Sequence, residues 1–304
     1  MSALDQLRLG EEAATALAEA RPVVALESTL ITHGLPFPQN LEAARRAEAA
    51  VRAGGAVPAT VALHGERIQV GLTDTELAEL AGIQGLAKVS RQTLAAALAR
   101  PDWAGTTVAA TLIGAQLAGI RVFATGGIGG VHRGAEDSMD ISADLAEIGK
   151  APVGVVCAGP KSILDVARTL EVLETLGVPV VGWRTDELPG FFARTSGLRA
   201  PARVDSAAEA AALMDRQLAL GLGGVLFCVP LPEDAALPRD VADAAIEQAV
   251  LDSAAAGIHG PASTPWILNR VAEITNGRSI LANLALIEHN AGIGAAIARA
   301  LLAR

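Results

Sequence analysis

Short apolar runs and longer amphipathic stretches alternate along most of the 304-residue chain. Apolar runs rich in branched aliphatic residues are typical of buried strands, whereas apolar residues at three- and four-residue spacing are typical of helices. The runs predict strands in residues 21–29, 121–125, 152–159, 179–185 and 223–231, and a hairpin in residues 56–72. The amphipathic stretches predict helices in residues 3–19, 38–55, 73–82, 106–118, 160–177, 207–221, 239–256, 263–275 and 281–302.

Strands that alternate with helices indicate βαβ units, so we expect a three-layer α/β/α fold with a mostly parallel central sheet. We assign residues 1–304 to one domain, because no low-complexity linker interrupts the pattern. Hydrophobic residues make up 51% of the chain and aromatic residues only 3%, which predicts an aliphatic core. Ligand sites in such sheets form at the carboxyl ends of the strands, so the residues directly after the apolar runs are the candidates for chemistry.

The charge and the cysteines narrow the class of protein. A formal net charge of −9 disfavours general binding to nucleic acid. Cys157 and Cys228 each lie inside an apolar run, so we interpret them as buried thiols of a cytoplasmic protein. The first twenty residues are acidic and amphipathic, unlike a secretory signal. The apolar stretch 108–127 contains Gln116 and Arg121, which favours a helix followed by a strand over a membrane span.

Two residues that follow apolar runs have the chemistry of an acid and of a nucleophile. Glu27 follows VVAL, where partial burial would raise the pKa of its carboxyl and favour a general acid; a structural ion pair is the alternative. Lys161 follows VGVVCAGP at the expected start of a helix. Burial and the positive end of a helix both favour a neutral amine, which can form a Schiff base with a sugar aldehyde. A lysine that reaches solvent or contacts a phosphate is the alternative.

Two further segments offer groups for binding. Lys88 and Arg91 precede a predicted helix and suit phosphate recognition, although a basic pair on the surface explains them equally well. The glycine-rich loop ATGGIGGVHRG, residues 124–134, matches neither the dinucleotide-binding nor the P-loop pattern. Its glycines permit close approach of the backbone to a ligand, and they equally permit a tight structural turn.

The next stretch, HRGAEDSMDISADL, places Asp137, Asp140 and Asp144 at i, i+3 and i+7, so a single helix would carry the three carboxylates on one face. Acids at a helix start complement the helix dipole, and they also offer hard oxygen ligands. A single carboxylate with water molecules suits Mg²⁺ or Mn²⁺. Asn283 and Asn290 lie one heptad apart near the end of the chain and either bind a base or phosphate or tie a helix to a loop.

Several blocks in one order resemble a known family. They are ALESTLITHGLPFPQN, VPATVALHG, KVSRQTLA, TTVAATLIGAQLAGIRVFATGGIGGVHRGAEDSMDISADL, CAGPKSILD and SILANLALIEHNA. Together they resemble the pseudouridine-5′-phosphate glycosidases, a family also named for its indigoidine synthase A-like members. The resemblance extends from about residue 20 to the end of the chain.

The resemblance implies reversible cleavage of the C–C glycosidic bond of pseudouridine 5′-phosphate to uracil and ribose 5-phosphate. It implies a homotrimer that uses a divalent cation, typically Mn²⁺. The matching positions make Glu27 the acid, Lys161 the Schiff-base lysine and Asp140 the metal ligand. The positions that match the family's substrate contacts are Lys88, Val108, Ser142, Ala143, Asp144 and, less securely aligned, Asn283. We interpret Asp137 as a solvated acid without a role in the site.

Two rival functions remain open at this stage. A Schiff-base aldolase or lyase acting on another sugar phosphate would use the same lysine, and it would need no uracil pocket. A non-catalytic binding protein for phosphorylated nucleosides would keep the phosphate and base contacts. It would have no reason to hold both Glu27 and Lys161 at strand ends, which disfavours it.

Overall fold

The computed structural model describes residues 3–258 and 263–304. Within these residues, strands form one sheet in the order β1-β4-β3-β2-β7-β8-β11-β9-β10, with β6 pairing β3 and β5 pairing β6 beside this path. The strands are β1 Leu7–Leu9, β2 Val23–Leu26, β3 Val57–His64, β4 Arg67–Val70, β5 Ala87–Val89, β6 Ala104–Thr106, β7 Val122–Ala124, β8 Gly154–Cys157, β9 Val180–Trp183, β10 Ala202–Val204 and β11 Val225–Cys228. Neighbouring strands are parallel except β3 with β4 and β3 with β6, so the predicted, mostly parallel sheet is confirmed.

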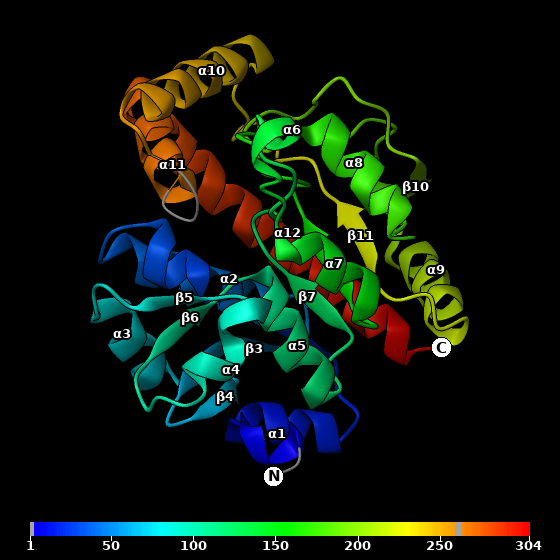
Figure 1. Cartoon of the computed structure of the whole chain (residues 1–304). Helices are drawn as coiled ribbons and strands as arrows, with labels where there is room; N and C mark the ends of the chain where they lie inside the picture. The colour runs from blue at the N-terminus through cyan, green and yellow to red at the C-terminus, as the bar shows by residue number, and fades with distance from the viewer. Residues whose placement is uncertain (1–2, 259–262) are drawn as a thin grey trace.

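Helices cover both faces of the sheet, which confirms the predicted three layers. They are α1 Glu11–Ala18, α2 Gln39–Ala53, α3 Asp74–Gly82, α4 Leu94–Ala97, α5 Val108–Ala118, α6 Ala135–Ser138, α7 Ala143–Lys150, α8 Val166–Thr175, α9 Ala207–Ala219, α10 Arg239–Ala255, α11 Ser263–Ile274 and α12 Arg278–Leu302. A π-helical turn spans Leu30–Gly34, and 3₁₀ turns span Ala3–Gln6 and Arg91–Thr93. In Figure 1, α5 and α7 lie in front of the sheet, and the long helix α12 crosses behind it.

The core divides at the sheet because successive side chains of a strand point to opposite faces. Val24 and Leu26 of β2 belong to a cluster with α2, α9 and α12, whereas Val23 and Ala25 belong to a second cluster with α1, α5, α7 and α8. Helix α12 is long and apolar enough to cross a membrane by length and composition alone. Half of its apolar window is buried in the molecule, and it contacts β2, β7 and β8, so it is the central helix of one layer.

Several expected elements form with the expected ends. The hairpin of β3 and β4 turns at Gly65 and Glu66, and the expected capping box starts α3. There the Glu76 N–H donates to the Thr73 hydroxyl at 3.2 Å, and the Thr73 N–H donates to the Glu76 carboxylate at 2.9 Å. The apolar stretch 108–127 forms α5 and then β7, as expected.

Two predicted helices are wrong at their start. Residues 3–19 do not form one helix, because Leu7–Leu9 pairs with β4 and α1 begins only at Glu11. Gly10 lies at this corner, where a Cβ atom would lie 1.9 Å from the Gly71 carbonyl oxygen. The helix expected from residue 160 begins at Val166, because the Asp165 side chain caps it by accepting the Arg168 N–H at 3.0 Å. The short strands β5, β6 and β10 were not predicted, since they lie in polar or mixed sequence.

Candidate active site

The acid Glu27 lies at the carboxyl end of β2, beside the end of β7. Leu26 pairs with Ala124 across these strands, so the next residues, Glu27 and Thr125, are neighbours. The Thr125 hydroxyl donates a hydrogen bond to the Glu27 carboxylate. Thr125 was not among the predicted site residues, although its place directly after the run RVFA could have identified it by the same rule that selected Glu27.

The loop that carries Lys161 is bonded along its length to the glycine-rich loop. The Ala158 N–H donates to the Gly126 carbonyl at 2.9 Å, the Ile128 N–H to the Gly159 carbonyl at 3.1 Å, and the Lys161 N–H to the Ile128 carbonyl at 3.1 Å. Lys161 therefore lies in a loop that precedes α8, and not at a helix start as expected. Backbone pairing, more than a helix dipole, fixes its position.

Four charged residues influence one another at this edge of the sheet. Burial raises the pKa of Glu27, and it outweighs the opposing effects of the Lys161 ammonium, the Thr125 hydroxyl and Lys88. Asp144 adds to the rise because it is a like charge. Burial lowers the pKa of Lys88, and the like charge of Lys161 lowers it further. The fold thus gathers an acid with a raised pKa, two lysines and a second carboxylate.

Asp144 connects the starts of two helices. Its Oδ1 accepts the Ala109 N–H at 2.9 Å, and its Oδ2 accepts the Gly129 N–H at 2.8 Å. The Ala109 N–H follows Val108, the first residue of α5, and Ser142 caps α7 by accepting the Asp144 N–H at 3.2 Å. The predicted substrate contacts Val108, Ser142, Ala143 and Asp144 are therefore together at two adjacent helix N-termini. Such termini are ready-made sites for a phosphate or another anion.

The acidic stretch is not one helix. Helix α6 ends at Ser138, Met139 has a left-handed backbone with φ +54°, and α7 begins at Ala143. The three aspartates consequently do not share one helical face, and the geometric premise drawn from their spacing is wrong. Asp144 is buried, whereas the Asp140 side chain is 43% exposed.

Asp140 offers a single carboxylate at the edge of the site. Its Oδ2 lies 3.9 Å from His132 Nδ1, and its carbonyl accepts the His132 N–H at 3.0 Å. No group of three or more His, Cys, Asp and Glu side chains able to hold a metal occurs in residues 3–258 and 263–304. This donor set does not form a closed metal cage. It fits a hard divalent cation whose shell is completed mainly by water and substrate oxygens.

The two asparagines of α12 have different surroundings. The buried Asn290 Nδ2 donates to the Thr125 carbonyl at 2.8 Å, which ties α12 to the strand end beside Glu27. Asn283 is only partly buried, and its Oδ1 lies 3.6 Å from the place of a Cβ atom on Gly126. Asn283 therefore faces the glycine-rich loop, while Asn290 has the structural role that was left open for both.

The basic residues near β5 also separate. Arg91 forms an ion pair with the buried Glu147, so it is committed to structure. Lys88 lies in β5, and its charge lowers the pKa of the adjacent His33 beyond the effect of burial. His33 Nδ1 lies 2.7 Å from the Thr32 hydroxyl. His33 was not among the predicted site residues. The sequence feature that could have identified it is its place in the segment LITHG, shortly after Glu27.

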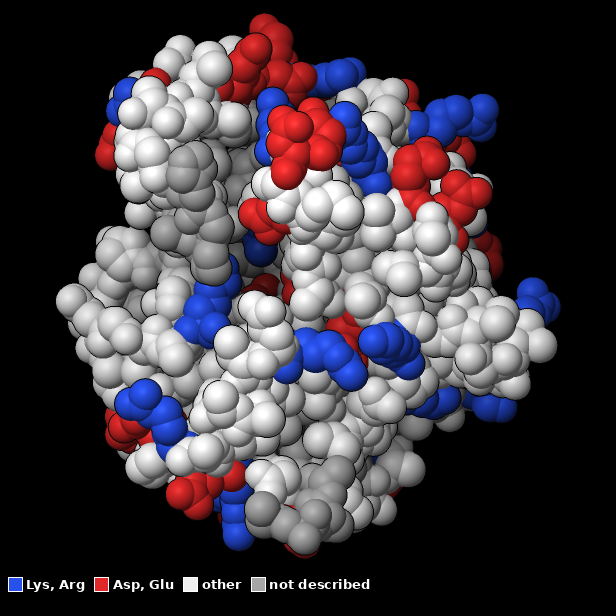
Figure 2. All heavy atoms as spheres, in the orientation of Figure 1, with Lys and Arg blue, Asp and Glu red and all other residues white. Residues whose placement is uncertain are grey.

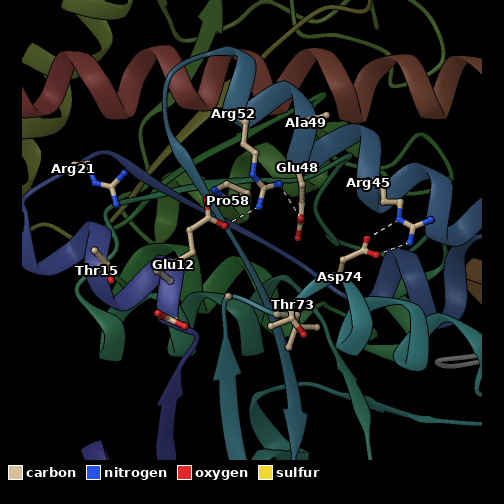
Figure 3. A pocket seen from close by; sticks show the side chains of 14 residues that line it. Glu12, Thr15, Arg21, Arg45, Glu48, Ala49, Arg52, Pro58, Thr73 and Asp74 are labelled. Atoms are coloured by element: carbon tan, nitrogen blue, oxygen red, sulfur yellow. Dashed lines mark hydrogen bonds and ion pairs between the residues drawn. The ribbon is translucent and has the colours of Figure 1, made fainter.

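Figure 2 shows a hollow in this face of the molecule, beside α12 and between α11 and the pair β5–β6, with acidic and basic side chains on its walls. A separate pocket of about 690 Å³ lies between α1, α2 and the start of α3 (Figure 3). None of the residues that line it is a predicted site residue. The candidate site is therefore distinguished by its chemistry and not by its size.

Known proteins resemble the chain over nearly its whole length. The family model described as "Indigoidine synthase A like protein" matches residues 12–300. Pseudouridine-5′-phosphate glycosidase of Sorangium cellulosum is 52% identical over 99% of this chain and 95% of the relative, and that of Jannaschia sp. is 55% identical over 97% and 98%.

Two crystal structures have a similar fold. The prealnumycin C-glycosynthase AlnA in complex with ribulose 5-phosphate gives a TM-score of 0.90 at 41% identity, with 98% of this chain and 97% of that chain covered. An indigoidine synthase A-like protein from Thermotoga maritima gives 0.86 at 35% identity, with 96% and 95% covered.

Proposed function

The chain belongs to the indigoidine synthase A-like family, and from this premise we propose that it is a pseudouridine-5′-phosphate glycosidase. The reaction is reversible cleavage of the C–C bond between uracil and ribose 5-phosphate. The observation that carries the proposal is the meeting of Glu27, Lys161, Lys88 and Asp144 at one edge of the sheet. The crystal structure of AlnA with a pentose phosphate supports a sugar phosphate as the substrate class.

A covalent route suits this bond better than ordinary glycoside hydrolysis. The uracil carbon offers no oxygen or nitrogen for protonation, so departure through an oxocarbenium ion is poorly supported. We propose that the ribose ring opens and that Lys161 bonds to C1′, because its nitrogen lone pair can form a C1′=N bond while the electrons of the C1′–C5 bond leave with uracil. The loop hydrogen bonds that fix Lys161 support this role.

The atoms balance with one water molecule. Glu27 donates a proton to the ring oxygen as the C1′–O4′ bond breaks, and the Lys161 amine bonds to C1′. Carbon C5 of uracil takes up one of the two protons of the Lys161 amine as the C1′–C5 bond breaks, the other amine proton leaves to solvent, and a C1′=N imine remains on Lys161. Water then hydrolyses the imine to release ribose 5-phosphate and the free amine. The raised pKa of Glu27 supports a protonated acid at the start of the cycle.

The remaining predicted contacts have roles in binding. We place the phosphate beside Val108, Ser142 and Ala143, with Lys88 as its counter-charge, although the Ala109 and Asp144 N–H groups at these helix starts already bond to Asp144 and Ser142. Asp144 already accepts two backbone N–H groups, so we favour it as an acceptor for a ribose hydroxyl over a mobile acid or base. Asn283 faces Gly126 and is suited to contact the base.

A divalent cation, Mn²⁺ by family resemblance, belongs to the same proposal. Asp140 would hold it, with His132 close enough to orient the carboxylate. When bound, the ion supplies positive charge that orients substrate oxygens. We also propose the homotrimer that the family resemblance implies, and light scattering of the purified protein tests it. The apolar Met139 and Ile141 beside Asp140 are 76% and 43% exposed, which is consistent with a covering subunit.

Release of uracil from pseudouridine 5′-phosphate, measured with and without Mn²⁺, tests the activity. We expect uracil release from this substrate and no cleavage of other sugar phosphates. No uracil release with or without Mn²⁺ would overturn the proposal. Cleavage of other sugar phosphates alone would favour the aldolase rival. Borohydride treatment during turnover should trap a sugar adduct that peptide mass spectrometry locates at Lys161. Undiminished trapping in Lys161→Ala would remove Lys161 from that role.

A further inference from the structure

A small cavity adjoins Glu27, between the sheet and the helices α2 and α12. Its volume is about 20 Å³, and most of its lining is aliphatic. Its polar lining residues are Glu27, Thr60 and Thr125. A cavity needs roughly 10–15 Å³ to hold one water molecule, which then requires two to four polar partners. This cavity meets both conditions and is too small for substrate.

Thr60 connects the cavity to a second carboxylate. In the sheet Thr60 pairs with Leu26, so it lies beside the residue that precedes Glu27. Thr60 is 1% exposed, and its hydroxyl donates to Glu48 Oε1 on α2 at 2.7 Å. The hydrogen bond between Thr60 and Glu48 is a buried polar contact between β3 and α2. The residues packed around it are mainly alanine and larger aliphatic residues.

Glu48 reaches the surface on its other side. Its Oε2 lies 3.2 Å from Arg52, which also bonds to Glu12 at 2.8 Å. Figure 3 shows Arg52 between these two carboxylates in the pocket of about 690 Å³. The Glu48 side chain is 11% exposed, so part of it contacts solvent while the rest is buried against Thr60. Because Arg52 is shared by two carboxylates, it neutralises Glu48 only in part.

The proposed reaction requires a route for protons to Glu27. The proton that Glu27 donates stays on the sugar as a hydroxyl, so each turnover must return one. The two hydrogens of the hydrolytic water balance those that end on O4′ and on uracil C5. They end on the Lys161 amine, where they replace the two protons that the amine lost, and neither is passed to Glu27. The cavity offers a route to Glu27 from the side of α2.

We propose that one water molecule in the 20 Å³ cavity joins Glu27 to Thr60, and that Thr60 and Glu48 form a proton relay between Glu27 and the pocket of Figure 3. The inference rests on the proposed function. A proton taken up by Glu48 passes to the Thr60 hydroxyl, Thr60 donates its own proton to the water, and the water donates to Glu27. The proton that the Lys161 amine loses to solvent as it becomes an imine balances the one taken up at Glu48. Thr60 and Glu48 act through Glu27 and do not touch substrate.

Substitution at Thr60 separates the relay from packing. Thr60→Val keeps the branched shape of the side chain and removes the hydroxyl. Thr60→Ser removes a methyl group and keeps the hydroxyl. We expect kcat of Thr60→Val to fall about 10-fold, which is less than the 10²–10⁴-fold that general acid catalysis contributes, with KM little changed. Thr60→Ser should retain the wild-type kcat. Glu48→Gln, which accepts from Thr60 but cannot carry the proton, should behave like Thr60→Val.

The decisive measurement is the dependence of kcat on deuterium oxide and on buffer concentration. In Thr60→Val the proton return becomes rate-limiting, so the solvent isotope effect should increase and imidazole buffer should restore kcat. Neither response follows from a packing defect. Equal solvent isotope effects in wild type, Thr60→Val and Glu48→Gln, or an equal loss of kcat in Thr60→Ser, would overturn the relay. Absence of uracil release by the wild type would instead contradict the proposed function.

Discussion

Gly129 lies where two site residues approach the backbone most closely, so Gly129→Ala is a direct test of the site. An added Cβ atom would lie 2.3 Å from Ser142 Oγ, 2.6 Å from Ser142 Cβ and 2.8 Å from Asp144 Oδ2. None of these atoms belongs to the end of a long flexible side chain, since Ser142 caps α7 and Asp144 bonds to two backbone N–H groups. The added methyl group must therefore displace the cap or the carboxylate.

The magnitude follows from the contacts that must change. Overpacking of this kind costs about 1–3 kcal/mol. If Asp144 moves, the hydrogen bond from the Gly129 N–H is lost, and bonds to a charged group contribute about 1.5–3 kcal/mol. Together these predict a loss of about 2.5–6 kcal/mol in the free energy of unfolding. A displacement near 1 Å in a site costs about 100-fold in rate, so kcat/KM should fall by that order.

Thermal unfolding and uracil release measure the two effects. At about 1.6 °C per kcal/mol for a chain of this length, Tm of Gly129→Ala should fall by about 4–9 °C. Gly82→Ala is the matched control, because Gly82 is exposed at the end of α3 with no atom within 4 Å of an added Cβ. The control should leave Tm and activity unchanged or slightly raise Tm. A Gly129→Ala protein with wild-type Tm and wild-type kcat/KM would refute the close approach on which the site depends.

Three shorter predictions test the charges and the thiols. Folding raises the pKa of Glu27 above 4.5, so the folded protein binds more protons than the unfolded chain, and its stability falls as the pH rises from about 4.5 to the raised pKa. Glu27→Gln should therefore raise Tm at pH 8, leave Tm unchanged at pH 4 and abolish uracil release. Lys88 lowers the pKa of Glu27, so Lys88→Met should shift the alkaline limb of the pH–kcat profile to higher pH and raise KM; an unshifted limb would contradict the contact. Cys157 and Cys228 are free and buried, and their mutual contact together with burial raises the pKa of Cys228. A thiol reagent should therefore label neither cysteine in the native protein and both in denaturant.

The parts of the fold that the sequence predicts are those set by local pattern. The strands formed by VVAL, VFA, GVVC and VLFC are buried on both faces, so each is a continuous apolar run with little ambiguity. Edge strand β1 was missed because Leu-Arg-Leu is too short to indicate a strand without its partner β4. The early start assigned to α8 has a similar cause, since Pro160–Leu164 is compatible with a helix until the glycine-rich loop pairs with it.

The candidate site shows the same division between local and tertiary information. Glu27 and Lys161 could be selected because each directly follows a buried run, but the register that brings Thr125 to Glu27 is a property of the sheet. The spacing of Asp137, Asp140 and Asp144 suggested a shared helix face, but α6 ends before Met139, which has a left-handed backbone, and α7 begins only at Ala143. No periodicity reveals this break.

The position of Glu27 explains why an acid, lysines and a second carboxylate can serve one reaction. A buried carboxyl among aliphatic residues alone would stay protonated and could not take back a proton readily, whereas full pairing with a lysine would keep it ionised. Here burial raises its pKa while Lys161, Thr125 and Lys88 oppose the rise, so neither protonation state is excluded. An acid that must give up and regain a proton in every turnover requires that balance. The same argument predicts that the groups that line the cavity beside Glu27, beginning with Thr60, contribute to turnover although they do not touch the substrate.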